Sequence, residues 1–285
     1  MKSVLALAVL ILFAAHGAAR ATSCAASFVN LDLGTYTGLQ STSGTSSATI
    51  NCPNGFKYAI GLSAGTGSGA TTTIRKMTGP GSATLSYKLF QDSAHGTNWG
   101  NINGTDARSG TGNGANQTVS VFPLIPAAQY VAPGTYTDTI IGTIFNTSPL
   151  GSGPITVRAT VAVSCTISAN ILAFGTYTGA QKDASAIVAV ICTNTTPYYV
   201  NLGNGLLPDG SFYPRMKGPG ADLLSYRLYQ NAGRTTEWRN TYHLDGQAGT
   251  GNGVSQPLTV YGRISAGQLV RPGAYADTVI ATITY

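Results

Sequence analysis

The sequence predicts an all-β protein of two tandem immunoglobulin-like β-sandwich domains, of which the C-terminal one lacks its final strand. Three observations lead to this fold class. The chain repeats its landmark residues once, in the same order, in its second half. Its apolar residues alternate along short segments that Gly- and Pro-rich turns separate. An alternating segment that follows the first copy has no counterpart after the second.

The landmarks of the first copy return at a nearly constant offset. Cys24 returns as Cys165 near the start of the copies, and Leu85 returns as Leu224 further along. A period of this length indicates a duplicated domain rather than a solenoid. The predicted boundaries are a leader at 1–21, a first domain at 22–153, a linker strand at 154–163 and a second domain at 164–285.

The leader has the features of a secretory signal peptide. Lys2 precedes an apolar run at 4–15, and Ala19-Arg20-Ala21 is the small-x-small pattern that signal peptidase cleaves. No other segment approaches the length of a membrane span. We expect the mature chain to begin at Thr22, to be exported through the inner membrane, and not to insert into a membrane.

Four cysteines form two pairs at matching places in the two copies, Cys24 with Cys52 and Cys165 with Cys192, and the spacing within the two pairs is nearly equal. In an oxidising compartment this pattern predicts one disulfide per domain. Closing loops of this size stabilises each domain by roughly 3 to 4 kcal/mol. A zinc site is the alternative, but CxxC spacing and nearby histidines are missing.

Each copy contains the same series of predicted strands. A Gly-Pro-Gly turn at 79–81 and 218–220 precedes a Leu-Ser-Tyr-x-Leu segment in both. No segment repeats its apolar residues at helical spacing over a useful length. In chain order, the expected strands are 58–62, 85–89, 118–122 and 136–145 in the first copy and 198–202, 224–228, 258–261 and 275–285 in the second.

The unmatched stretch after the first copy alternates strictly. Thr156, Arg158 and Thr160 lie on one predicted face. The sequence leaves open whether this strand closes the first domain, opens the second, or does both in succession. Its other, apolar face is formed by Ile155, Val157, Ala159, Val161 and Val163.

The second copy ends at Tyr285, which aligns with Asn146, so no corresponding strand follows it. A strand with about five inward apolar side chains contributes some 8 to 15 kcal/mol of burial, at roughly 1.5 to 3 kcal/mol each. The whole stability of a typical domain is about 5 to 15 kcal/mol. We therefore expect the second domain to expose an apolar groove between two unpaired strand edges, a template for an incoming strand.

Composition argues against catalysis and nucleic-acid binding. The formal net charge of +6 falls to +4 without Lys2 and Arg20, and no run of basic residues could follow a phosphate backbone. His95 and His243 occupy non-equivalent places without a recognisable nucleophile. The Gly-rich segments 110–114 and 249–253 lack the Lys or Asp residues of phosphate and calcium loops. We expect no enzyme activity, no catalytic residue, no metal site and no cofactor.

At family level, the residues resemble the spore coat protein U domain. The resemblance rests on the two cysteines of each copy, the Gly-Thr-Tyr-Thr-Gly segment, the Leu-Ser-Tyr-x-Leu strand, Trp99 and Trp238, and Pro272-Gly-x-Tyr-x-Asp-Thr-Val279. It covers both copies. The family includes subunits of archaic, Csu-type chaperone-usher pili, so the resemblance implies two pilin-type sandwiches.

The resemblance also implies partners and a place in a pilus. Such subunits are held by a periplasmic chaperone, pass through an outer-membrane usher, and are completed by the N-terminal donor strand of a neighbouring pilin subunit. A two-domain subunit sits at the tip, with a surface- or receptor-binding first domain. Only Thr22 and Ser23 would precede Cys24, so we expect a subunit that accepts a strand but donates none, and that acts in adhesion and biofilm formation.

For the groove that accepts a strand, the closing segment supplies the candidates Tyr275, Val279, Ile283 and Tyr285. Ile155, Val157, Ala159 and Val161 are the candidates for a strand that completes the first domain internally. The adhesive surface, its ligand and the partner subunits are not identifiable from these residues. The alternative function is a structural outer-coat or matrix protein of the same family without specific adhesion.

Overall fold

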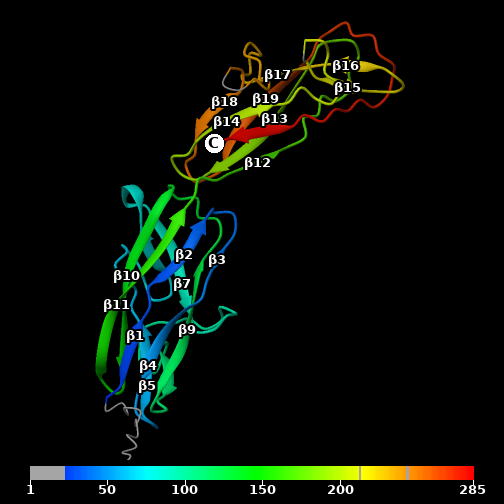
Figure 1. Ribbon diagram of the computed structural model, residues 1–285. Helices are drawn as coiled ribbons and strands as arrows, with labels where there is room; N and C mark the ends of the chain where they lie inside the picture. The colour runs from blue at the N-terminus through cyan, green and yellow to red at the C-terminus, as the bar shows by residue number, and fades with distance from the viewer. Residues whose placement is uncertain (1–22, 212, 242–243) are drawn as a thin grey trace, which may run out of the picture.

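The computed structural model describes residues 23–211, 213–241 and 244–285. Within these ranges the chain forms two β-sandwiches joined end to end (Figure 1). The predicted signal peptide at 1–21 and His243 lie outside the described residues. The one helical element described is a single 3-10 turn, η1 (Pro80–Ser82), and none of the described helical segments is long and apolar enough to cross a membrane.

The first sandwich consists of two sheets with a shared apolar core. One sheet has the order β1-β4-β9-β7-β6 and the other the order β8-β5-β10-β11-β2, with β3 on β9 and a single pairing between β6 and β10 joining the two sheets. Its strands are β1 (Ala25–Phe28), β2 (Leu31–Tyr36), β3 (Thr42–Ser43), β4 (Ser46–Asn51), β5 (Lys57–Leu62), β6 (Arg75–Thr78), β7 (Thr84–Phe90), β8 (Arg108–Thr111), β9 (Asn116–Ile125), β10 (Gly134–Phe145) and β11 (Pro149–Val161).

β11 closes the first sandwich. It pairs antiparallel with β10 along nearly its whole length and parallel with β2, so it lies between them. Its residues Ile155, Val157, Ala159 and Val161 are at most 2% exposed. The sequence left the role of this strand open, and in the structure it belongs to the first domain.

The strand differs from the predicted one at both ends. It begins at Pro149 rather than at 154, because pairing with β10 holds a Gly- and Ser-rich stretch that shows no alternation in the sequence. The inward position predicted for Val163 is wrong. Val163 lies beyond the end of β11 and is 52% exposed.

The second sandwich repeats the first with two elements missing. Its strands form the sheets β12-β13-β19-β17, β18-β14-β20 and β15-β16. Within the described residues, nothing corresponds to β11, and the segment equivalent to β2 is not a strand. The strands are β12 (Cys165–Ala169), β13 (Lys182–Cys192), β14 (Pro197–Leu202), β15 (Arg215–Lys217), β16 (Leu223–Ser225), β17 (Arg227–Tyr229), β18 (Gln247–Thr250), β19 (Gln256–Ile264) and β20 (Ala281–Thr284).

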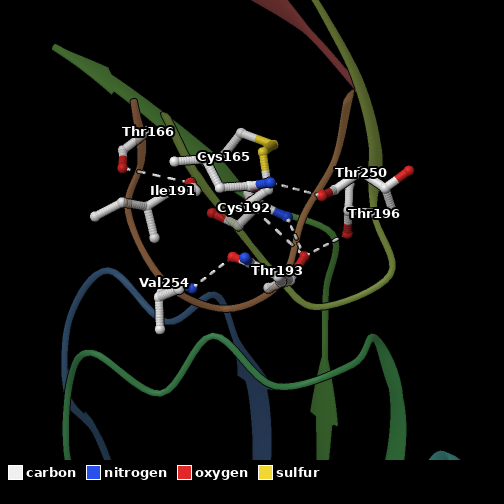
Figure 2. Close-up of a disulfide and its surroundings, with 11 residues drawn as sticks. Cys165, Thr166, Ile191, Cys192, Thr193, Thr196, Thr250 and Val254 are labelled. Atoms are coloured by element: carbon white, nitrogen blue, oxygen red, sulfur yellow. Dashed lines mark hydrogen bonds between the residues drawn. A yellow bond between two sulfur atoms is a disulfide. The ribbon is translucent and has the colours of Figure 1, made fainter. Parts of the chain in front are cut away.

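Equivalent side chains anchor the two cores. Trp99 and Trp238 are at most 1% exposed, and their indole N–H groups donate to the carbonyls of Ile60 and Val200 at 2.7 and 2.8 Å. Both tryptophans therefore serve packing rather than a surface. Both predicted disulfides are present, Cys24–Cys52 and Cys165–Cys192. The second links β12 to β13 at the end of the sandwich that faces the first domain (Figure 2).

Candidate strand-accepting groove

The candidate site is a groove in the second domain, at the place that β11 occupies in the first. The repeat aligns β2 with residues 172–177 and the first half of β10 with residues 275–280. Between these two segments the structure has a groove of about 1080 Å³. No described strand lies between them.

Both walls and the floor of the groove are mainly apolar. The first wall comes from the β2-like segment, the second from the β10-like segment, and the floor from β13, β16, β17 and β19. The apolar side chains that line it include Leu172, Phe174, Tyr177, Val188, Leu224, Leu228, Val260, Ile264, Val270, Tyr275 and Val279. An open apolar cleft of this size in a sandwich is suited to an extended segment with alternating apolar side chains.

Comparing the burial of equivalent residues in the two domains shows what a strand in the groove would cover. In the first domain, Tyr36 of β2 and Tyr136 and Ile140 of β10, the two strands that pair with β11, are fully buried. Their counterparts Tyr177, Tyr275 and Val279 are only partly buried. Because the residue types and their order match, the difference follows from the absence of a covering strand.

The backbone of the groove walls is also unpaired where the first domain is paired. β10 forms a continuous ladder with β11, whereas 275–280 forms only an isolated bridge between Ala276 and Lys217 and a hydrogen bond from the Gly203 amide to the Ile280 carbonyl. β20 therefore begins only at Ala281, and the prediction of a strand over the whole of 275–285 is wrong. The physical reason is that an edge strand without a partner has no ladder to hold its first half.

A polar anchor holds the β10-like wall in place without the covering strand. Asp277 accepts hydrogen bonds from the Tyr226 hydroxyl and from the amides of Leu206 and Thr278, each at 2.8 Å. Burial raises the pKa of the Tyr226 phenol well above its ordinary value, and the hydrogen bond to Asp277 acts in the same direction. The phenol therefore remains a donor at physiological pH.

The first domain contains the same anchor. Asp138 accepts from the Tyr87 hydroxyl at 2.8 Å and from the Thr66 amide at 2.8 Å. Gly65 and Gly205 have positive φ, and a Cβ at either would lie 2.1 and 2.0 Å, respectively, from the facing carboxylate. Only glycine allows this approach. The wall is thus built alike in the closed and the open domain.

The four residues proposed from the sequence fall into two groups. Tyr275 and Val279 line the groove. Ile283 lies in β20 opposite Val200 and packs against the second core, and Tyr285 is 55% exposed and does not line the groove. The sequence reasoning missed the opposite wall, Leu172 to Tyr177. Alignment of the Gly-Thr-Tyr-Thr-Gly motifs with the covered strand β2 would have pointed to it.

Among the described residues, no group of three or more His, Cys, Asp or Glu side chains is arranged to hold a metal ion. The groove itself presents apolar side chains and, along 275–280, backbone groups without a strand partner.

Comparisons with known proteins agree with this architecture. The spore coat protein U domain model matches residues 10–143 and 152–282. Protein U of Myxococcus xanthus is 34% identical over 145 residues, which is 45% of this chain and 80% of that protein.

Among solved structures, the fold is similar to that in the pre-assembly complex of chaperone CsuC with the tip adhesion subunit CsuE, from the archaic chaperone-usher Csu pili of Acinetobacter baumannii. The TM-score is 0.57 at 15% identity, over 92% of this chain and 100% of that one. Neither the family match nor this structural match is to an enzyme.

Proposed function

The chain belongs to the spore coat protein U domain family, and from this premise we propose that it is an exported subunit of a chaperone-usher pilus, placed at the tip. Its second domain accepts a donor strand from a neighbouring pilin subunit. Its first domain, complete in itself, contacts a surface or receptor. Before assembly a periplasmic chaperone occupies the groove, and an outer-membrane usher exports the subunit.

One observation carries this proposal: the same sandwich occurs twice in one chain, once with β11 between β2 and β10 and once with a groove of about 1080 Å³ in that place. The first domain therefore displays the filled state of the second. Main-chain pairing on both sides and alternating apolar side chains are what strand addition requires.

The tip placement is supported by the two-domain arrangement. A closed first domain offers no groove to a further subunit, so of the two domains only the second can accept a donor strand. The similarity in fold to a tip adhesion subunit over 92% of the chain supports the same placement.

A second candidate function is a structural component of an outer coat or matrix, and the 34% identity to Protein U of Myxococcus xanthus favours it. The strand-accepting groove is common to both candidates. They differ in what the first domain does. A fibre that binds a surface through its end supports the first, and incorporation into a layer without such binding supports the second.

The groove is tested by giving the second domain its own strand. Because Tyr285 aligns with Asn146, residues 147–163 are appended directly after Tyr285 in the full mature chain. We expect the tail to fold back as β11 does, to protect the amides of 275–280 from hydrogen exchange, and to keep the chain monomeric on gel filtration without a chaperone.

The matched control is the same tail with serine at the positions of Ile155, Val157 and Ala159. It has equal length and keeps only Val161 of the four inward apolar side chains of β11. Equal protection of 275–280 with both tails, or with neither, would contradict strand acceptance by this groove.

A further inference from the structure

We propose that the far end of the second domain, formed by Gly179, Gly267 and Leu269, is a docking surface for the disulfide-bearing end of the next subunit. The inference rests on the proposed function and adds a contact at the end of the groove, where Gly179 and Leu269 are among the lining residues. The contact is made with the body of the next subunit rather than with its donor strand. The junction between the two domains of this chain serves as its template.

The first element of that template is the short connection between the filling strand and the next domain. β11 ends at Val161 and β12 begins at Cys165, so only Ala162, Val163 and Ser164 lie between them. The Ala162 amide donates to the Tyr36 carbonyl at 3.0 Å. The strand that fills one domain thus continues almost directly into the disulfide end of the following domain.

That disulfide end is rigidly tied to the connection. Ser164 is buried, its amide donates to the Thr193 hydroxyl at 3.2 Å, and the Thr193 amide donates to the Ser164 carbonyl at 2.9 Å. Figure 2 shows Thr193 and Thr196 beside Cys165 and Cys192, above the ribbons of the first domain. The position of the filling strand therefore fixes the position of this end.

The second element is a direct contact between the domains at one loop. The Tyr130 carbonyl accepts a hydrogen bond from the Asn194 amide at 2.9 Å. The same carbonyl would lie 2.9 Å from a Cβ at Gly253, which has a φ of +80°. On the other side, a Cβ at Gly38 would lie 3.0 Å from the Tyr130 ring. Tyr130 is half-buried: its ring lies against its own domain, and its backbone carbonyl contacts the base of the next one.

The loop that presents Tyr130 is held by a specific set of hydrogen bonds. The Tyr36 hydroxyl accepts from the Gln129 amide at 3.0 Å and donates to the Pro126 carbonyl at 2.7 Å. The Gln129 side chain pairs with the backbone of Ser86, and the Ala128 amide donates to the Gly38 carbonyl at 2.7 Å.

The second domain builds the same loop, bond for bond. The Tyr177 hydroxyl accepts from the Gln268 amide at 3.0 Å and donates to the Ser265 carbonyl at 2.9 Å. The Gln268 side chain pairs with the backbone of Ser225, and the Gly267 amide donates to the Gly179 carbonyl at 2.9 Å.

In Figure 1 the segment between β19 and β20 reaches the end of the second domain furthest from the first. Leu269 lies in this segment, at the place that corresponds to Tyr130 in the first domain. It is 99% exposed. Single exposed apolar side chains are normal on protein surfaces, so its exposure alone does not call for a partner. The argument for a partner is that the equivalent loop of the first domain meets the next domain through the Tyr130 carbonyl.

The occupant that fits is the disulfide end of a neighbouring subunit of the same fold. It requires an amide like that of Asn194 after the second cysteine and a glycine like Gly253 in the facing loop. Asn54 and Gly114 hold these places in the first domain, so both copies in this chain carry such an end. The template also sets the length of the connection between donor strand and disulfide end. In this chain three residues separate Val161, the last inward side chain of β11, from Cys165.

The test uses this chain as both partners. The acceptor is the mature chain, as wild type and as Leu269→Asp. The donor is the mature chain with residues 153–164 fused directly before Cys24 and with residues 147–163 appended after Tyr285 to fill its own groove. A second donor carries a Gly-Ser-Gly insertion before Cys24. A free peptide of residues 153–163 measures occupancy of the groove alone.

We expect Leu269→Asp to weaken binding of the first donor roughly tenfold or more, as for losing a buried leucine at an interface. Because Leu269 also lines the groove, the free peptide measures the part of this loss that belongs to the groove alone. Binding of the peptide and of the donor with the insertion should therefore fall much less than binding of the first donor, and equal losses for all three would contradict the docking surface. If the peptide and donors bind wild-type acceptor but Leu269→Asp binds the first donor equally well, the docking surface is wrong and strand acceptance stands. If the peptide and both donors fail to bind wild-type acceptor, the proposed function fails.

Discussion

The matched leucines Leu31 and Leu172 provide the sharpest test of the difference between the two domains. They occupy equivalent positions, and substitution to alanine removes the same atoms from each. Leu31 is 3% exposed and lies in β2, opposite Val157 of β11. Leu172 is only partly buried and lines the open groove.

The expected magnitudes differ because only one site is enclosed. Leu31→Ala leaves a cavity in a packed core and lowers the free energy of unfolding of the first domain by about 2 to 5 kcal/mol. Leu172→Ala removes contacts from a wall that solvent already reaches, so we expect about 1 kcal/mol or less for the second domain. In the chain with residues 147–163 appended, the effect of Leu172→Ala should rise to the range expected for Leu31.

The assay is native-state hydrogen exchange read by mass spectrometry, because slowly exchanging amides report the stability of each domain separately. Peptides from β10 report the first domain and peptides from β13 report the second. Equal losses for the two alanine variants in the chain without a tail would refute the reasoning, and so would a tail that leaves the effect of Leu172→Ala unchanged.

Three further predictions follow from single features. Arg75 is fully buried, donates to four backbone carbonyls, and keeps its charge although burial lowers its pKa to about 10. Arg75→Met should therefore lower the free energy of unfolding of the first domain by about 3 kcal/mol or more in urea titrations, since the carbonyls lose their donor. The hydrogen bond from Arg158, and then that from the Gly34 amide, lower the pKa of Asp32. This contribution to stability is present above the ordinary carboxyl pKa and is lost as pH falls below about 4, so acid titration of Asp32→Asn should show a shallower loss, most clearly at low salt. Replacing Cys165 and Cys192 together by serine should lower the stability of the second domain by about 2 to 5 kcal/mol and increase its need for a chaperone in a co-expression yield assay.

The sequence contained the fold because the features that build it are local and repeated. Alternation along 85–89 and 224–228 indicates strands with one buried face. The Gly-Pro-Gly segments indicate turns, and the matching cysteines indicate a closed loop in each domain. The strand after the first copy was recognisable because Ile155, Val157, Ala159 and Val161 alternate without interruption. All four are buried in β11.

The features that were not predicted from the sequence depend on contacts with residues far away along the chain. Pro149 to Gly153 becomes strand only through pairing with β10, and 275–280 fails to become strand because no neighbour lies beside it. Arg75 shows no sign in the sequence that its side chain would be buried, since its carbonyl partners come from β5 and from loops. The place of Leu269 is visible only from the hydrogen bonds that make its loop equivalent to that of Tyr130.

The closed and open domains also differ in what determines their stability. The three large inward side chains of β11, Ile155, Val157 and Val161, contribute roughly 5 to 9 kcal/mol of burial, at about 1.5 to 3 kcal/mol each. For the first domain this contribution is intramolecular and does not depend on concentration. In the proposed assembly the second domain receives the same contribution from another molecule, so its stability would rise with the concentration and affinity of the strand that binds it. Folding of the second domain and assembly are then one equilibrium, and a subunit that has found no partner remains the less stable form.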